Sequence, residues 1–280
     1  MNVLQAGSFR LNYSRPLIMG IVNVTPDSFS DGGSYPKPDD AIAHALRLKD
    51  EGAAILDIGG ESTRPGAAAV SQEEEMRRVL PLVETLAARG LVVSVDTRNP
   101  GVMRAAIAAG AAMINDISSL QGEGALEAVA PANVAVCLMH MQGTPATMQK
   151  APGYVNVVEE VGGFLEARAR ACLAAGIARE RLAIDPGFGF GKTLRHNLCL
   201  LARLQEFSRL GLPILAGLSR KKMLGQLTGR EVREREYAGV AAHLAAVARG
   251  AKILRVHNVA AMRDALAVWN AIEGVQQHDA

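Results

Sequence analysis

PLIMGIVNVTPDSFSDGG, residues 16–33, is an apolar run that opens directly into a polar loop. The apolar part, 16–22, is short, continuous and rich in Ile, Leu and Val, which predicts a buried strand. The loop, 23–33, is too long and too polar for a simple turn, and loops of this kind usually carry function. The strand therefore delivers polar side chains at its C-terminal end.

The same pattern returns along the chain. The run ILDI at 55–58 opens into the polar segment GGESTRPG at 59–66, and VVSV at 92–95 ends in Asp96 and Thr97. Apolar runs recur at fairly even intervals, at 16–22, 54–58, 91–95, 112–114, 134–139, 182–184, 213–216 and 252–256. Helix-like stretches separate or follow them, at 39–51, 72–88, 100–109, 124–130, 157–175, 194–210, 234–249 and 260–272.

This alternation predicts the fold. Strands that alternate with helices form a parallel sheet with right-handed crossovers. Eight such units in about 250 residues favour a closed barrel over an open sheet. The structural alternative is a doubly wound open sheet, but its usual Gly-x-Gly-x-x-Gly after the first strand is absent. We therefore expect an α/β protein, a (β/α)₈ TIM barrel, with residues 1–280 forming a single domain.

Composition excludes several classes of protein. Hydrophobic residues make up 49% of the chain and aromatic residues only 4%, so the large core must be aliphatic. The net charge of +2 and the lack of a basic run give no indication of nucleic-acid binding. No apolar stretch is long enough to span a membrane, and no secretory signal is visible. Cys137, Cys172 and Cys199 lack the spacing of a zinc site or a disulfide framework, so we expect buried thiols in the cytoplasm.

Polar residues stand at or just after every predicted strand. They are Asn23, Asp57, Asp96, Asn115 with Asp116, His140, Asp185, Ser219 with Lys221, and Arg255 with His257. Single strand ends are often merely solvated or cap the next helix. In a barrel, however, the C-terminal strand ends meet at one mouth, which is where barrel enzymes carry out their chemistry. We therefore expect these side chains to form a ligand site.

Three of these residues share a chemical theme. Asp96, Asn115 and Asp185 offer acceptors and one carboxamide donor, which suits a flat heterocycle that shows N–H donors along one edge. Each carboxylate could instead only cap a loop. Asp185 favours the ligand role because it opens the segment DPGFGFGK, 185–192, whose glycines let the backbone approach a ligand closely.

The last two strands add positive charge. Lys221, Arg255 and His257 lie where barrels often bind phosphate, and the Arg255 guanidinium can also stack on a ring. Ser219 can cap a helix whose first N–H groups would favour an anion such as a carboxylate. The Asn23 carboxamide oxygen, beside a diphosphate, is a suitable protein ligand for Mg²⁺.

With these residues in place, the chain resembles the dihydropteroate synthase family of the bacterial folate pathway over essentially its whole length. The matching segments are 19–33, 59–66, 94–97, 114–117, 138–143, 185–192, 219–221 and 255–257. The resemblance implies a transferase that condenses 6-hydroxymethyl-7,8-dihydropterin diphosphate with para-aminobenzoate, giving 7,8-dihydropteroate and diphosphate in folate biosynthesis. It further implies a cytoplasmic homodimer that uses Mg²⁺ and is a target of sulfonamides.

The resemblance also assigns roles to single residues. It implies that the pterin diphosphate binds Thr63, Asp96, Asn115, Asp185, Lys221, Arg255 and His257. It places the aminobenzoate beside Phe29, Thr63, Arg64, Pro65, Ser219 and Lys222, and Mg²⁺ on Asn23. No covalent nucleophile is expected, because no Ser-His-Asp or Cys-His set is recognisable. The predicted dimer would pack the Ala-, Val- and Leu-rich helices 234–249 and 260–272 across a two-fold axis.

One position departs from the family pattern. Family members often carry Ser or Thr after the lysine of Ser-Arg-Lys, whereas this chain has Lys222. Either backbone N–H groups hold the aminobenzoate carboxylate or the Lys222 ammonium replaces the hydroxyl. Two other functions remain as alternatives. A pterin-binding methyltransferase would not need the diphosphate residues, and a non-catalytic paralogue would be expected to have lost Asn23, Arg64 or His257.

Overall fold

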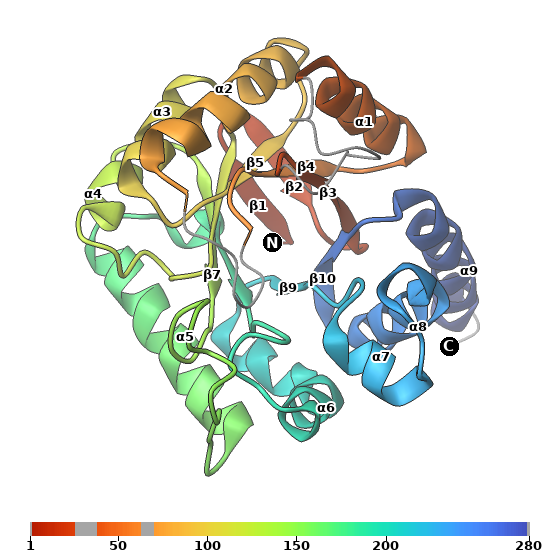
Figure 1. Ribbon diagram of the computed structural model, residues 1–280. Helices are drawn as coiled ribbons and strands as arrows, with labels where there is room; N and C mark the ends of the chain where they lie inside the picture. Colours follow the sequence, from red (N-terminus) through yellow and green to blue (C-terminus); the bar gives the residue numbers. More distant parts are fainter. Residues whose placement is uncertain (1, 26–37, 63–69, 279–280) are drawn as a thin grey trace.

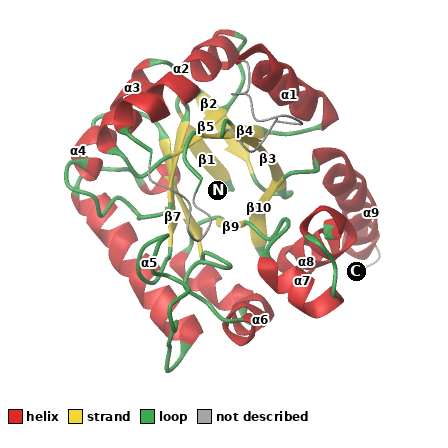
Figure 2. Cartoon of the chain, viewed as in Figure 1, coloured by secondary structure: helices red, strands yellow, loops and turns green. Residues whose placement is uncertain are grey.

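The structure, a computed structural model, describes residues 2–25, 38–62 and 70–278. Eight parallel strands form a closed barrel in the order β10-β3-β4-β5-β6-β7-β8-β9, and helices surround it (Figures 1 and 2). The barrel strands are β3 (Leu17–Asn23), β4 (Ile55–Gly59), β5 (Val93–Asp96), β6 (Met113–Asp116), β7 (Ala135–Met139), β8 (Leu182–Asp185), β9 (Ile214–Ala216) and β10 (Ala251–Val256). The predicted (β/α)₈ barrel is confirmed.

The helices follow the predicted order, with two differences in detail. They are α1 (Pro38–Glu51), α2 (Gln72–Ala88), α3 (Pro100–Ala108), α4 (Ala125–Val129), α5 (Val157–Ala174), α6 (Leu194–Ala202), α7 (Lys222–Thr228), α8 (Glu236–Val247) and α9 (Val259–His278). The helix predicted at 194–210 is α6 followed by the 3₁₀ helix η2 (Leu204–Leu210). Further 3₁₀ turns are η1 (Arg179–Arg181) and η3 (Val232–Glu234), and α7 was not predicted as a separate helix.

Local sequence accounts for where these helices begin. The Ser71 hydroxyl accepts a hydrogen bond from the Glu74 amide at 3.3 Å, so Ser71 caps α2, and three glutamates follow in the first turn. Thr193 caps α6 in the same way, accepting from the His196 amide. Such caps fix the point at which each loop of the barrel turns into a helix.

A hairpin that was not predicted closes one end of the barrel. Its strands, β1 (Val3–Ala6) and β2 (Phe9–Asn12), pair antiparallel, and the N-terminus lies at the centre of the ring in Figure 1. Leu4 and Ala6 are buried in one cluster with barrel-interior residues such as Met19 and Met113. The hairpin also contacts η1, which immediately precedes β8. It therefore covers the N-terminal ends of the strands and leaves the opposite end for ligands.

Alternation along each strand separates the two faces of the barrel. In β3, Ile18 and Val22 pack with the helices, whereas Met19 belongs to the interior cluster. The interior is aliphatic at the hairpin end and polar at the C-terminal end. Its apolar part consists of Met19, Ile55, Ala112, Met113, Ala135, Cys137, Ala183, Leu215 and Ile253 with the hairpin residues. The end where the strands terminate, called the barrel mouth below, is thus the polar end.

Candidate active site at the barrel mouth

An arginine between two carboxylates forms the centre of the barrel mouth. The Arg255 Nε on β10 donates to Asp57 Oδ2 on β4 at 2.6 Å, and its Nη2 donates to Asp96 Oδ2 on β5 at 2.8 Å. Asp57 Oδ2 also accepts from Asn115 Nδ2 on β6 at 3.2 Å. Four strands therefore supply one connected polar network.

Charge in this network is unbalanced, because one guanidinium faces two carboxylates. Burial opposes the charged form of Arg255, but Asp57 and Asp96 more than offset it, so the pKa of the guanidinium is raised. Burial raises the pKa of Asp96; Arg255 opposes this rise and Asp57 adds to it. Asp57 Oδ1 is buried and has no hydrogen-bond partner among the described residues. The network thus holds more acceptor capacity than its own donors fill.

Asp185 ends β8 beside this network. Its Oδ1 accepts from the Gly187 amide at 2.7 Å, and the residue is 6% exposed. Burial raises the pKa of its carboxyl, while the Gly187 amide and Lys221 oppose the rise. The Lys221 ammonium lies 4.1 Å from the centre of the Phe190 ring, and burial lowers its pKa to about 8. A buried carboxylate and a cation on an aromatic face thus stand side by side.

The glycines after Asp185 have a structural reason. Gly187 has a φ of 70°, and a Cβ there would lie 1.9 Å from the His140 carbonyl oxygen. Gly191 has a φ of 62°, and its Cβ would lie 2.6 Å from the Gln142 carbonyl oxygen. Both positions therefore require glycine, because the segment packs on the chain that follows β7. The predicted close approach to a ligand stays a prediction.

Two polar strand-end residues do not belong to the barrel mouth, contrary to the prediction. His140 packs edge-on against the Phe164 ring of α5 with centroids 5.0 Å apart, and burial, followed by Lys192, lowers its pKa to about 3. Asp116 accepts from the backbone amides of Ser118 and Leu120, both at 2.7 Å. Each is one residue out of phase with the inward positions of its strand, so it faces the helices.

Ser219 lies in the predicted region, where it contacts His257. Its hydroxyl contacts His257 Nδ1 at 2.9 Å and accepts from the His257 amide at 3.3 Å. The predicted helix cap by Ser219 is wrong, because α7 begins at Lys222 and its N-cap position is Lys221. Lys222 is exposed at the start of this short helix. Ser219 therefore joins the loop after β9 to the end of β10.

Asn23 ends β3 and faces the same mouth. A Cβ on Gly59 would lie 3.6 Å from Asn23 Oδ1 and 3.8 Å from the Asp96 Cβ, so the Asn23 amide oxygen and Asp96 flank the same glycine. The remaining predicted residues lie outside the described part of the chain. They are Phe29, Thr63, Arg64 and Pro65.

The structure adds residues to which sequence reasoning gave no role. Asp57 was recognised as a strand-end residue, and its inward position two residues after buried Ile55 was the available signal. Glu61 pairs with Arg98 through contacts of 3.1 and 3.2 Å, and Arg78 donates to the Gly60 carbonyl at 2.8 Å. These contacts secure the end of β4, and no sequence motif indicated them.

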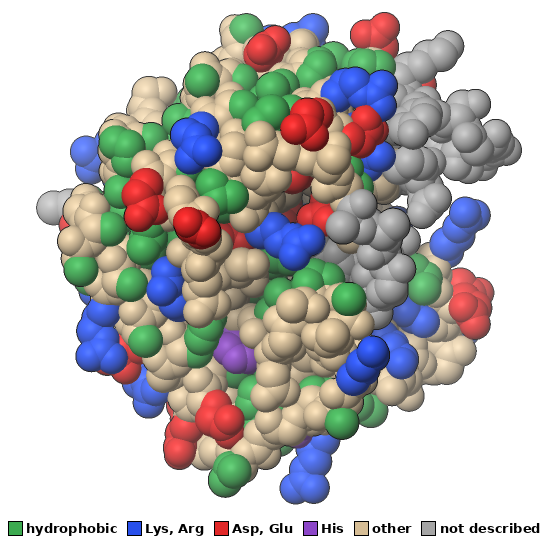
Figure 3. All heavy atoms as spheres, turned by 60° about the vertical axis from the view of Figure 1, so that its left-hand side comes forward, with side chains coloured by type: hydrophobic (Ala, Val, Ile, Leu, Met, Phe, Trp, Pro, Cys, Tyr) green, Lys and Arg blue, Asp and Glu red, His purple; other side chains and the backbone are tan. Residues whose placement is uncertain are grey.

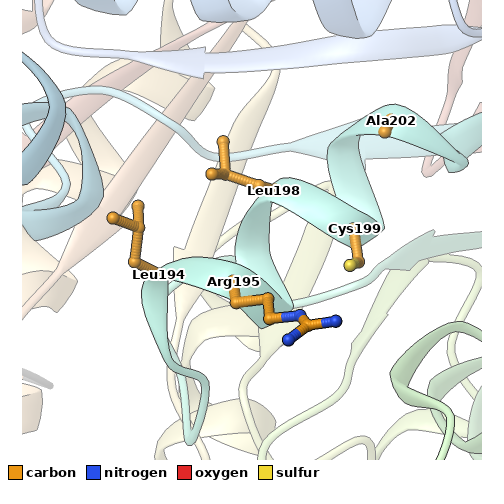
Figure 4. Close-up of a pocket in the computed structure, with 5 residues that line it drawn as sticks. All are labelled: Leu194, Arg195, Leu198, Cys199 and Ala202. Atoms are coloured by element: carbon orange, nitrogen blue, oxygen red, sulfur yellow. The ribbon is translucent and has the colours of Figure 1, made fainter.

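A shallow cavity of about 520 Å³ lies on one helix, α6 (Figure 4), and none of the side chains that line it belongs to the polar network around Arg255. Leu194, Arg195, Leu198, Cys199 and Ala202 line it. On the face seen in Figure 3, basic and acidic side chains are interspersed. Among the described residues, no helix is long and apolar enough to cross a membrane.

Comparison with known proteins agrees with this geometry. The family described as "Pterin binding enzyme" matches residues 19–257. A dihydropteroate synthase of Neisseria meningitidis serogroup C is 53% identical over 276 residues, covering 97% of this chain and 98% of the relative. The solved Xanthomonas albilineans dihydropteroate synthase with 4-aminobenzoic acid has a TM-score of 0.92 and 56% identity, covering 97% of this chain and 98% of its own.

A second solved structure is similar in the same way. It is a Burkholderia cenocepacia dihydropteroate synthase complexed with 7,8-dihydropteroate, with a TM-score of 0.91 and 50% identity, covering 99% of this chain and 98% of its own. Sequence and fold therefore agree over nearly the entire chain, and it belongs to the pterin-binding enzyme family and, within that family, to the dihydropteroate synthases.

Proposed function

We propose that this chain condenses 6-hydroxymethyl-7,8-dihydropterin diphosphate with para-aminobenzoate at the barrel mouth. The observation that carries the proposal is the inward polar set at the mouth. Asp96 binds Arg255 directly, Asn115 is joined to Arg255 through Asp57, and Asp185 lies across Gly217 from Arg255. The carboxylates and carboxamide of this set match the N–H donors and carbonyl along the edge of a pterin. The Xanthomonas albilineans relative holds 4-aminobenzoic acid and the Burkholderia cenocepacia relative holds 7,8-dihydropteroate, which are a substrate and the product of this reaction.

Lys221 and Arg255 are assigned to the pterin ring. The half-buried Lys221 has its ammonium close to Asp185, which favours its charged form. The planar guanidinium of Arg255 is already held by two carboxylates, so it offers a fixed flat surface to a ring. Little ordering of these side chains is then required when the pterin binds.

His257, Asn23 and Thr63 are assigned to the diphosphate, with Mg²⁺ as cofactor on Asn23. The hard carboxamide oxygen of Asn23, across Gly59 from Asp96, suits this ion. Mg²⁺ keeps several waters and takes oxygens from the substrate, so a single protein oxygen is a sufficient contribution. When bound, Mg²⁺ would neutralise charge on the departing diphosphate.

The reaction needs no covalent intermediate on the protein. The C–O bond between the pterin methylene carbon and the diphosphate breaks, and a C–N bond forms to the aminobenzoate nitrogen, which releases one proton. The arylamine is neutral at pH 7 and needs little activation. The residues of the mouth therefore contribute by binding both partners in line and by stabilising the charge that develops.

The aminobenzoate is assigned to the side of the mouth formed by the loops after β3, β4 and β9. Ser219 is fixed there by its contacts with His257, and Lys222 stands exposed nearby. Phe29, Thr63, Arg64 and Pro65 would complete this subsite. A sulfonamide would compete for the same place, because it presents an arylamine of similar shape.

We also propose that the chain forms a homodimer in the cytoplasm. Apolar side chains are exposed on the late helices, with Tyr237 on α8 88% exposed and Val268 on α9 64% exposed. All three cysteines are free thiols, which suits a reducing compartment. Sedimentation should give a dimer at micromolar concentration, and a monomer would contradict the proposed assembly.

The test of function is product formation by the purified protein. The enzyme should form 7,8-dihydropteroate from both substrates, and chelation of Mg²⁺ with EDTA should slow the reaction strongly. Pterin binding without product would instead favour a non-catalytic role. Methyl transfer from a reduced folate to a corrinoid protein would favour the methyltransferase alternative.

A further inference from the structure

Lys192 is a buried charged group to which the proposed reaction gives no task. It closes the segment 185–192 and is 3% exposed. Its ammonium has four partners: the carbonyl oxygens of Gly187 at 2.9 Å, Phe190 at 2.9 Å and His140 at 3.3 Å, and the ring nitrogen His140 Nδ1 at 3.0 Å. An ammonium can only donate, so His140 Nδ1 accepts and the ring is neutral.

Two of these partners lead directly to Asp185. The Gly187 amide donates to Asp185 Oδ1 at 2.7 Å, and the His140 amide donates to the Asp185 carbonyl oxygen at 3.0 Å. Lys192 therefore holds both the side chain and the backbone of Asp185 through one intervening residue each. Any shift of the ammonium would change where that carboxylate points.

The third partner leads to Lys221. The Phe190 carbonyl accepts from Lys192, and the Phe190 ring carries the Lys221 ammonium 4.1 Å from its centre. Phe190 therefore links the two lysines through its backbone and its ring. The buried ammonium of Lys192 is thus connected to Asp185 and to Lys221, the two charged residues that are assigned to the pterin and lie outside the Arg255 network.

We infer that Lys192 is a positioning residue for pterin recognition, which holds Asp185 and Lys221 in place through the glycine loop, residues 186–191. The inference rests on the proposed function, because it concerns the pterin site of that reaction. Side chains that only stiffen a loop are common, but this ammonium joins two segments inside the fold, the glycine loop and the chain after β7. Burial lowers the pKa of Lys192 to about 7, and Asp185 opposes that fall. Asp185 therefore helps to keep the Lys192 side chain charged.

The chain offers a matched control on the same loop. The Tyr154 hydroxyl donates to the Gly191 carbonyl at 2.8 Å, at the end of the loop away from Asp185. This bond is separate from the contacts of Lys192 with Gly187 and His140, which lead to Asp185. It is also separate from the contact of Lys192 with the Phe190 carbonyl. Tyr154→Phe therefore weakens the loop without removing the contacts made by Lys192.

The test compares Lys192→Met, an apolar side chain of similar length, with Tyr154→Phe and the wild type. Binding of 6-hydroxymethylpterin is measured by calorimetry, and KM is measured for each substrate. We expect Lys192→Met to weaken pterin binding about 10- to 100-fold and to raise the KM for the pterin diphosphate alike. The KM of Lys192→Met for aminobenzoate should stay within about 3-fold of wild type. The pterin affinity and both KM values of Tyr154→Phe should also stay within about 3-fold of wild type.

A second variant covers the case in which Lys192→Met fails to fold. His140→Ala keeps the buried ammonium and removes its ring partner together with the packing of that ring on Phe164, and we expect a smaller loss of pterin affinity, about 3- to 10-fold. A purely structural role would lower the melting temperature and leave the pterin affinity of the folded protein unchanged. The inference would be overturned if the folded variants bound pterin as tightly as the wild type, or if Tyr154→Phe weakened pterin binding as much as Lys192→Met. In either case, product formation by the wild type would still support the proposed function. A wild type that neither binds pterin nor forms product would overturn both.

Discussion

Arg255 and Asp57 are 198 residues apart in the chain, yet the Nε of one donates to Oδ2 of the other at 2.6 Å. The contact joins the last barrel strand to the second, and Asp96 on the third strand shares the same guanidinium. Because Asp57 is fully buried, its charge has little access to water. The pair therefore fixes the guanidinium in the plane that the pterin would face.

Asp57→Asn should weaken both stability and pterin binding. An asparagine oxygen could still accept from both Arg255 and Asn115, because both donors bind the same oxygen of Asp57. The amide, however, removes the negative charge beside the buried guanidinium and places an NH₂ group where the buried Oδ1 has no partner among the described residues. We expect a loss of roughly 1–3 kcal/mol in unfolding free energy by urea denaturation and a clear loss of pterin affinity. The control is Asp264→Asn, which removes a surface carboxylate, 71% exposed, from its pair with Arg263. Equal effects of the two substitutions would contradict the role of the buried pair.

Removing the carboxylate of Asp185 should abolish pterin binding and leave the fold intact. The Asp185→Ala variant loses the partner for the pterin edge, and each unpaired donor in a buried site costs about 1–3 kcal/mol, more where charge is involved. Calorimetry with a pterin ligand measures the effect, and circular dichroism checks the fold. An affinity equal to that of wild type would refute the assignment.

Lys221 and Lys222 should differ sharply although they are neighbours. The Lys221 ammonium lies over the Phe190 ring near Asp185, whereas Lys222 is exposed. Lys222→Ser should keep most of the turnover and shift mainly the KM for aminobenzoate. Lys221→Ala should raise the KM for the pterin diphosphate. A loss of turnover in Lys222→Ser as large as that in Lys221→Ala would show that the roles are misassigned.

The charge of Lys221 should appear in the pH profile. Burial lowers its pKa from the usual 10.5 to about 8, so the ammonium is present below that pH and is lost above it. If the cation holds the pterin, kcat/KM for the pterin diphosphate falls as the pH rises through about 8. In Lys221→Met this fall should disappear, because methionine does not titrate. Any fall caused by titration of the substrate would remain in both proteins. A profile unchanged by the substitution would assign the fall to another group.

His243 should make stability depend on pH. It is 1% exposed on α8, where its Nε2 accepts from the Leu218 amide at 3.3 Å and its Nδ1 lies 2.8 Å from the Gly239 carbonyl oxygen. Burial lowers its pKa from 6.5 to about 4. Between these values the unfolded chain binds the proton and the folded chain does not, so stability falls as the pH drops below 6.5.

A variant isolates this contribution from the other titrating groups. His243→Gln keeps a side-chain acceptor for the Leu218 amide and removes the titration. From pH 7 to pH 5 the wild type should lose about 2 kcal/mol of unfolding free energy relative to the variant. Urea unfolding at both pH values measures the difference. Parallel stability curves would mean that the pKa of His243 is the same in the folded and the unfolded chain.

Local sequence determined the barrel strands and most of the inward polar residues. Alternation with period two places Asp57, Asp96 and Arg255 on one face of their strands, and the polar loops mark where those strands end. The same periodicity misled at His140 and Asp116, because a shift of one residue turns a side chain toward the helices. The hairpin of β1 and β2 was not predicted, because each of its two strands has only four residues.

Tertiary structure alone decided which of these residues meet. No local pattern relates Arg255 to Asp57, because the contact depends on closure of the barrel between β10 and β3 and on the register of β3 with β4. The same holds for Lys192, which closes the predicted segment 185–192 and received no role of its own from the sequence. Its burial follows from packing of that segment on the loop after β7, where Gly187 meets the His140 carbonyl. Propensity and periodicity act over a few residues, whereas strand register and loop packing are set by the whole closed sheet.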